Sequence, residues 1–142
     1  THDLPPAAGY LEYGHVKLRE QLGLLSGPVE EFQKSAEAEH NAMLSMLVDE
    51  GYLDASALED ELANENEIID ALYRGLKGSP CKLMAASIVD AVGEKRTQNQ
   101  PGTSNEYPNW RIPLADGDGN VVPLEQLFDN TRLQEIAAIM RG

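Results

Sequence analysis

The stretch CKLMAASIVDAVG, residues 81–93, decides the fold class, because it is almost uniformly apolar and shows no clear 3.6-residue period. Such a run is typical of a strand buried on both faces, as in a parallel sheet that is covered by helices. A buried helix is the competing interpretation of the same residues. The strand interpretation predicts an α/β fold. Because no other stretch offers a second strand of this kind, we expect its neighbours to come from residues outside this chain.

The segments around this run are predicted to be mostly helical. The clearest helix follows Pro28, carries an apolar stripe from Val29 to Leu47 and ends at Gly51. Residues 52–66 indicate an acidic loop with a short helix, and Asn130 is a predicted cap for the last helix. The remaining predicted helices cover residues 7–11, 15–25, 67–76 and 123–128.

Charge and cysteine content limit the classes of partner. The 142 residues include 24 acidic and 11 basic side chains, which gives a net charge of −13 and disfavours nucleic acid and anionic membranes. Cys81 has no partner for an internal disulfide and is predicted to be a small buried hydrophobe. No basic-plus-apolar leader opens the chain, and no apolar run approaches the roughly 18 residues of a membrane span. These features predict a cytoplasmic protein.

Two patterns that resemble metal sites do not complete them. Asp116-Gly117-Asp118-Gly119-Asn120 begins like a calcium loop, but the required Gly and Glu would fall at Val121 and Leu127, so a tight turn is predicted instead. The three histidines are scattered, and His40 lies on an apolar helix face, where a satisfied core or interface residue is expected. The sequence predicts no metal site and no cofactor.

Two polar stretches remain as functional candidates. His2 and Asp3 precede Pro5-Pro6, which excludes a continuing helix or central strand and fixes a loop. Residues 98–111, QNQPGTSNEYPNWR, hold the only Trp together with three Asn and two Pro. Aromatic faces and planar amides suit a neutral, hydroxyl-rich ligand such as a sugar. The alternative is that Trp110 fills the core beneath the loop.

These two stretches resemble the C-terminal part of the 4-α-glucanotransferases, also called amylomaltases or disproportionating enzymes. Residues 1–5, THDLP, resemble the Thr-His-Asp segment of that family. Residues 99–103, NQPGT, followed by 106–111, EYPNWR, resemble its Asn-x-Pro-Gly-Thr and Asn-Trp-Arg signature. Residues 9–10 and 88–90 also match in place.

The resemblance implies a (β/α)₈ TIM barrel, of which residues 1–142 would be one C-terminal segment. Its seventh strand would end near Thr1, and its eighth would be the run from Leu83 to Val89. Loops beyond the C-terminal ends of such strands form the active site, so the two stretches are expected to be neighbours in space. We expect the isolated segment to self-associate, since the eighth strand would lack its neighbours.

The resemblance also implies the chemistry. The family transfers α-1,4-glucan segments between maltodextrins with retention through a glycosyl-enzyme intermediate. Asp3 matches its transition-state-stabilising carboxylate, His2 a sugar-binding histidine, and Asn99 an asparagine of the active-site cleft. Pro101 and Gly102 belong to the same substrate-binding loop. The nucleophile and the general acid would lie in the remainder of the barrel, so the isolated chain is expected to be inactive.

A second hypothesis comes from a different functional class. The high acidic content and the apolar stripe between Val29 and Leu47 also fit a non-catalytic helical module that binds a protein partner. An upstream barrel with two further carboxylates in the parent reading frame would decide for the enzyme.

Overall fold

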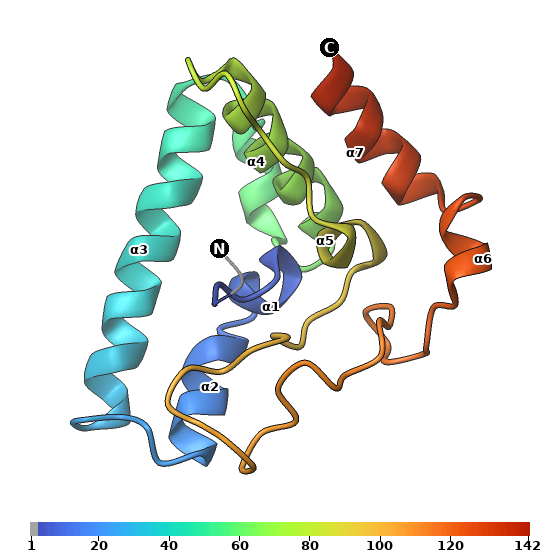
Figure 1. Cartoon of the computed structure of the whole chain (residues 1–142). Coiled ribbons are helices and arrows are strands. Elements are labelled where there is room, and N and C mark those ends of the chain that lie inside the picture. The colour runs from blue at the N-terminus through green and yellow to red at the C-terminus, as the bar shows by residue number, and fades with distance from the viewer. Residues whose placement is uncertain (1–2) are drawn as a thin grey trace.

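The computed structural model describes residues 3–142, and helices are the regular secondary structure of this part of the chain (Figure 1). A single isolated bridge joins Ala115 and Val121. The elements are α1 (Ala7–Leu11), α2 (Gly14–Gln21), α3 (Val29–Asp49), the 3-10 helix η1 (Ala55–Glu59), α4 (Glu65–Gly78), α5 (Ile88–Val92), α6 (Leu124–Leu127) and α7 (Thr131–Arg141).

The core forms where α4 meets α1, α3 and α7. Ile68 and Ile69 of α4 are completely buried, and Ile136 of α7 is 1% exposed. Burying an aliphatic side chain of this size contributes about 1.5–3 kcal/mol relative to leaving it in water. Arg132 of α7 donates to the Asp70 carboxylate of α4 at 2.8 Å, which fixes the register of the two helices.

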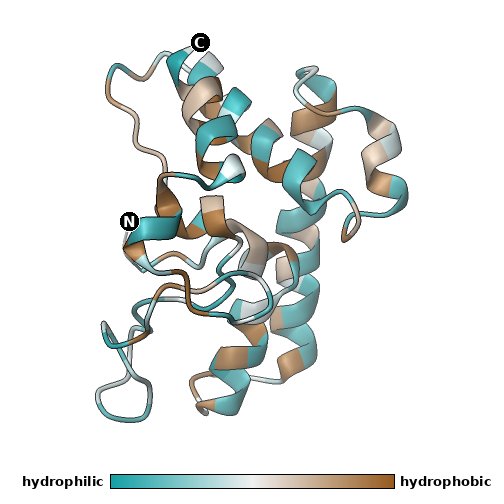
Figure 2. Ribbon diagram, turned by 90° about the vertical axis from the view of Figure 1, so that its right-hand side faces the viewer, coloured by the Kyte–Doolittle hydropathy of each residue, from teal (hydrophilic) through white to brown (hydrophobic). Residues whose placement is uncertain are grey.

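The helix α3 has the predicted position. It begins after Pro28 and ends just before Gly51, whose φ of +74° suits glycine at a helix C-terminus. Its apolar stripe packs inward, and Leu44 and Leu47 are 3% and 1% exposed. Figure 2 shows hydrophobic and hydrophilic residues alternating along the helical ribbons. The C-terminal half of the stripe on α3 is therefore covered by this chain's own core.

The predicted strand in residues 83–89 is wrong for the described chain. Residues 81–87 have no regular structure, and Ile88–Val92 form α5. Leu83 is 94% exposed. A strand requires a neighbouring backbone that completes its hydrogen bonds, and residues 3–142 offer no adjacent strand. The apolar content of this run thus does not lead to burial here.

Two smaller predictions have opposite outcomes. Cys81 is exposed rather than buried, because it lies in the same uncovered segment. The tight turn at residues 116–120 is confirmed: the Asp116 carboxylate accepts hydrogen bonds from the backbone N–H groups of Asp118 at 3.0 Å and Asn120 at 2.9 Å.

Among the described residues, no helix combines the length and the apolar character that a membrane span needs.

Candidate functional site

The two functional stretches meet in space. The Asn99 side-chain amide donates a hydrogen bond of 2.7 Å to Oδ1 of Asp3, although 96 residues separate them. Asp3 is exposed and Asn99 is half-buried, so the pair lies at the surface. The expectation that the two stretches are neighbours is met for Asp3 and Asn99. His2 was also predicted at this site, but it lies outside the described residues.

The position of Asp3 depends on α1. Asp3 leads into Pro5-Pro6, whose rings restrict the backbone up to the first residue of α1. The N–H of that residue, Ala7, donates to Oδ1 of Asp90 at 2.7 Å. The carboxylate of α5 thus holds the start of α1.

The position of Asn99 depends on the same helix. A Cβ atom on Gly9 of α1 would lie 2.2 Å from the backbone oxygen of Lys95, closer than real Cβ atoms come to any neighbour. Glycine lets the two backbones touch at this point. The Lys95 ammonium group also pairs with the Glu12 carboxylate just beyond α1. Lys95 lies four residues before Asn99, so α1 contacts the segment that leads into the 98–111 loop.

Side chains within residues 98–111 fix the loop's shape. Asn109 accepts the Gln100 N–H at 2.7 Å through Oδ1 and donates to the Thr103 hydroxyl at 2.8 Å. The Thr103 hydroxyl in turn donates to the Gln100 carbonyl at 2.7 Å. Because an amide side chain has both a donor and an acceptor, Asn109 can hydrogen-bond to two residues of the turn at once, and this restricts the conformation of the turn. The loop is thereby ordered by its own polar residues.

The two aromatic residues of this loop differ in role. Tyr107 is buried and donates its hydroxyl to the Thr97 carbonyl at 2.7 Å, which attaches the loop to the segment before it. Trp110 is 62% exposed, so the alternative in which it fills the core is wrong. Its backbone φ of +60° is unusual for a bulky residue. Its backbone N–H donates to the Gln98 carbonyl at 2.8 Å.

Pro101 and Gly102 form the exposed tip that follows Asn99. Gly102 has φ +87°, a conformation that side chains disfavour, and the Thr103 N–H closes the turn on the Gln100 carbonyl at 3.3 Å. The tip therefore presents backbone and little side-chain bulk, which allows a ligand to approach closely.

The model of the family described as 4-alpha-glucanotransferase matches residues 1–117. The chain belongs to the 4-alpha-glucanotransferase family. The resemblance found in residues 1–5 and 99–111 is thus confirmed over most of the chain.

Relatives of this chain support the same family assignment. The 4-alpha-glucanotransferases of Mycobacterium tuberculosis and Mycobacterium bovis are each 48% identical over 142 residues, all of this chain and 19% of their own length. That of Haemophilus influenzae is 28% identical over 137 residues, covering 94% of this chain and 19% of its own. The crystal structure of amylomaltase from Corynebacterium glutamicum superposes with a TM-score of 0.86 at 38% identity, over 99% of this chain and 21% of that one. The chain thus spans about a fifth of the length of these relatives.

Two carboxylates, one buried and one half-buried, were not predicted as site residues from the sequence. Glu94 is 1% exposed and accepts hydrogen bonds from the Arg96 guanidinium at 2.7 and 2.9 Å and from the Ala115 N–H at 3.0 Å. Burial acts to raise the pKa of Glu94, but these bonds outweigh it and hold that pKa below its usual range. Asp90 is the other. The feature of the sequence that could have pointed to Asp90 is that it is the one carboxylate inside the apolar run 81–93.

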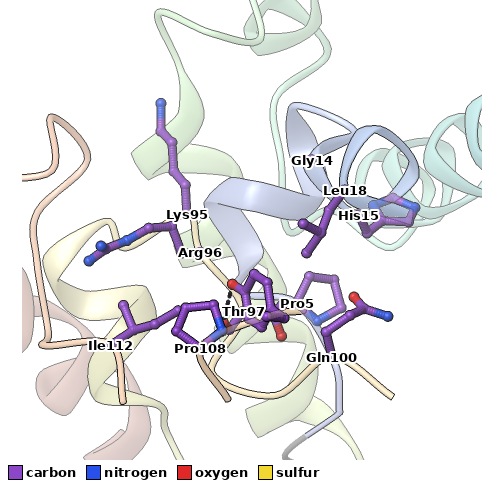
Figure 3. A pocket seen from close by; sticks show the side chains of 11 residues that line it. Pro5, Gly14, His15, Leu18, Lys95, Arg96, Thr97, Gln100, Pro108 and Ile112 are labelled. Atoms are coloured by element: carbon purple, nitrogen blue, oxygen red, sulfur yellow. Dashed lines mark hydrogen bonds between the residues drawn. The ribbon is translucent and has the colours of Figure 1, made fainter. Parts of the chain in front are cut away.

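A half-open cavity of about 320 Å³ lies beside the loop, between residues of the glucanotransferase signature and α2 (Figure 3). Pro5, Thr97 and Gln100 line it together with His15 and Leu18 of α2. Lys95 and Arg96 extend away from Pro5 and Gln100. The cavity is thus lined by polar and apolar side chains together.

The histidines give no metal site in the described part of the chain. No group of three His, Cys, Asp or Glu side chains is arranged to hold a metal ion there. His40 is 2% exposed, and its Nε2 lies 2.6 Å from a Glu61 oxygen, while its Nδ1 has no hydrogen-bond partner. His40 is thus a core residue with one of its two nitrogens satisfied.

Proposed function

We propose that this chain supplies part of the glucan-binding cleft of a 4-α-glucanotransferase, with Asp3 as its transition-state-stabilising carboxylate. The observation that carries the proposal is the 2.7 Å contact between Asp3 and Asn99. It joins the two stretches that resemble the family signature, and both groups are hydrogen-bonding side chains at the surface. Residues 1–142 would form one C-terminal segment of the catalytic barrel.

The reaction is the transfer of an α-1,4-glucan segment from one maltodextrin to another with retention. One carboxylate attacks the anomeric carbon, and a carboxylic acid protonates the leaving oxygen. The hydroxyl of an acceptor sugar then displaces the enzyme carboxylate. By the resemblance, those two groups lie in the remainder of the protein.

The role of Asp3 follows from the charge that develops on the sugar. The transition state is oxocarbenium-like, so positive charge spreads over the ring while the ring flattens. A carboxylate that accepts hydrogen bonds from the sugar hydroxyls interacts more strongly with this state than with the ground state, which raises kcat. The Asn99 amide donates to Asp3 and thereby orients its carboxylate before the substrate arrives.

The remaining site residues belong to the same proposal. His2 is proposed to donate a hydrogen bond to the same sugar, and Pro101 with Gly102 to line the cleft through their backbone. The partners are maltodextrins and other α-1,4-glucans, together with the remainder of the barrel. With a net charge of −13, the chain suits a neutral polysaccharide better than an anionic polymer.

The test is Asp3→Asn in the full-length protein. With maltotriose as substrate, chromatography of the maltodextrin products gives kcat and KM. We expect kcat to fall by about a hundredfold or more while KM changes by less than about threefold, because the lost interaction is made mainly in the transition state. Asp129→Asn, a change at an exposed carboxylate beside α6, is the matched control and should leave both constants unchanged. A kcat of Asp3→Asn close to that of wild type would remove Asp3 from the site.

The isolated chain gives a second test. Incubation of residues 1–142 with maltotriose should release neither glucose nor longer maltodextrins, because the attacking carboxylate and the acid are expected elsewhere. Turnover by this chain alone would contradict that distribution of the catalytic groups.

A further inference from the structure

Asp90 joins two helices that are far apart in the sequence. It lies in the short helix α5, and each of its carboxylate oxygens accepts a hydrogen bond from a different element. Oδ1 accepts the Ala7 N–H of α1 at 2.7 Å, and Oδ2 accepts the Tyr73 hydroxyl of α4 at 2.7 Å. The carboxylate thus connects the start of α1 to the central helix of the core.

The start of α1 has no capping group of its own. Its N-cap residue is Pro6, which makes no side-chain cap hydrogen bond, and its first turn has no acidic residue. The first N–H groups of a helix lack intrahelical partners and carry a partial positive charge. Asp90 supplies both an acceptor and a negative charge there, although 83 residues separate it from Ala7.

Tyr73 holds Asp90 in place. Its hydroxyl donates to Asp90 and accepts the Ser87 N–H at 3.0 Å, and the residue is 7% exposed. Burial raises the pKa of Tyr73 well above its usual value, with the neighbouring Asp90 acting in the same direction. The hydroxyl therefore remains a donor over the pH range in which enzymes of this kind are assayed.

A shift of α1 would change the candidate site directly. Toward the amino terminus, Pro5-Pro6 transmits the position of Ala7 to Asp3 through a restricted backbone. On its other side, Gly9 touches the Lys95 backbone, which leads to Asn99. The distance between Asp3 and Asn99 thus depends on where α1 begins.

We propose that Asp90 is a positioning residue for Asp3: by capping α1 from α5, it holds the Asp3 carboxylate at Asn99 and in the orientation that the sugar requires. The inference rests on the proposed function, since it takes Asp3 to be the carboxylate that meets the sugar. Asp90 itself contacts α1 and α4 and acts only through them.

A double-mutant cycle in the full-length protein tests this role. The variants are Asp90→Ala, Asp3→Asn and the two combined, with kcat and KM measured on maltotriose. Displacing a catalytic group by up to about 1 Å can lower the reaction rate by up to about a hundredfold. We therefore expect Asp90→Ala to lower kcat by about tenfold or more. In the Asp3→Asn background the same change should cost less than about threefold, because there is no carboxylate left to misplace.

Two matched variants separate positioning from general stability. Asp70→Ala also removes a carboxylate that joins α4 to another helix, through Arg132 at 2.8 Å, but that contact lies toward α7 rather than α1. It should lower the melting temperature without lowering kcat. Asp90→Asn keeps an oxygen that can accept the Ala7 N–H and should recover most of the rate lost in Asp90→Ala.

The outcomes are distinguishable. An unchanged kcat in Asp3→Asn alone overturns the proposed function. If Asp3→Asn is slow but Asp90→Ala costs the same in both backgrounds, or Asp70→Ala is equally slow, the positioning role is overturned while the proposed function stands. If Asp90→Ala fails to fold, Tyr73→Phe replaces it in the cycle: it removes one of the two bonds to Asp90, and the same non-additivity with Asp3→Asn is expected.

Discussion

Gly9 offers a direct measure of how closely α1 lies against the segment that leads to Asn99. In Gly9→Ala the new Cβ would lie 2.2 Å from the Lys95 backbone oxygen, so the two backbones must separate by about 1 Å to reach ordinary contact. Overpacking of this kind costs roughly 1–3 kcal/mol, and a rigid backbone on both sides favours the upper end. The higher helix propensity of alanine offsets about 1 kcal/mol of this loss in the free energy of unfolding. We therefore expect a net loss of about 2 kcal/mol.

Urea denaturation of the chain, followed by circular dichroism, checks this value. For a slope of about 2 kcal/mol per molar, the midpoint should fall by about 1 M. The control is Gly75→Ala in α4, where the new Cβ would meet the Leu47 and Tyr52 side chains at an ordinary 3.6 Å. That variant should be more stable than wild type by up to about 1 kcal/mol. Equal stability of the two variants would refute the close contact of α1 with Lys95.

Two further predictions concern the segment around the site. Because the folded-state pKa of Glu94 lies below its ordinary value, its contribution to stability is present above about pH 4.5 and is lost as the pH falls through the lower folded pKa. The midpoint of urea unfolding should therefore fall more steeply between about pH 5 and pH 3 in wild type than in Glu94→Gln; parallel curves would contradict this. Asn109→Ala should speed hydrogen exchange of the Gln100 N–H by about tenfold, because that N–H loses its acceptor, whereas Asn105→Ala should not; unchanged exchange in Asn109→Ala would contradict the loop geometry.

Local patterns predicted several helices, although α5 lies where a strand was expected. Pro28 and Gly51 flank α3, and Asn130 caps α7 by accepting the Leu133 N–H at 2.8 Å. Each of these residues acts on backbone groups within one helical turn of it, so its effect can be predicted from the neighbouring sequence. The family signature similarly predicted that the first stretch lies beside the 98–111 loop, and among the described residues Asp3 contacts Asn99.

Long-range pairing could not be read in the same way. Ala7, one of the two partners of Asp90, is 83 residues away from it, and Ala115, which donates to Glu94, is 21 residues from Glu94. Hydrophobicity also misled the interpretation of residues 81–87, because an apolar run is buried only if something covers it. The exposure of Leu83 and Cys81 depends on which elements surround that run, and the run's own composition does not determine this.

The irregular segment 81–87 separates an amino-terminal part that carries Asp3 from a carboxy-terminal part that carries Asn99. Non-covalent contacts hold these parts together, from the ion pair of Arg132 with Asp70 to the approach of Gly9 to Lys95. A backbone cut among the exposed residues 81–83 would leave each of these contacts in place. After such a cut, the two peptides would be held to each other by these same contacts.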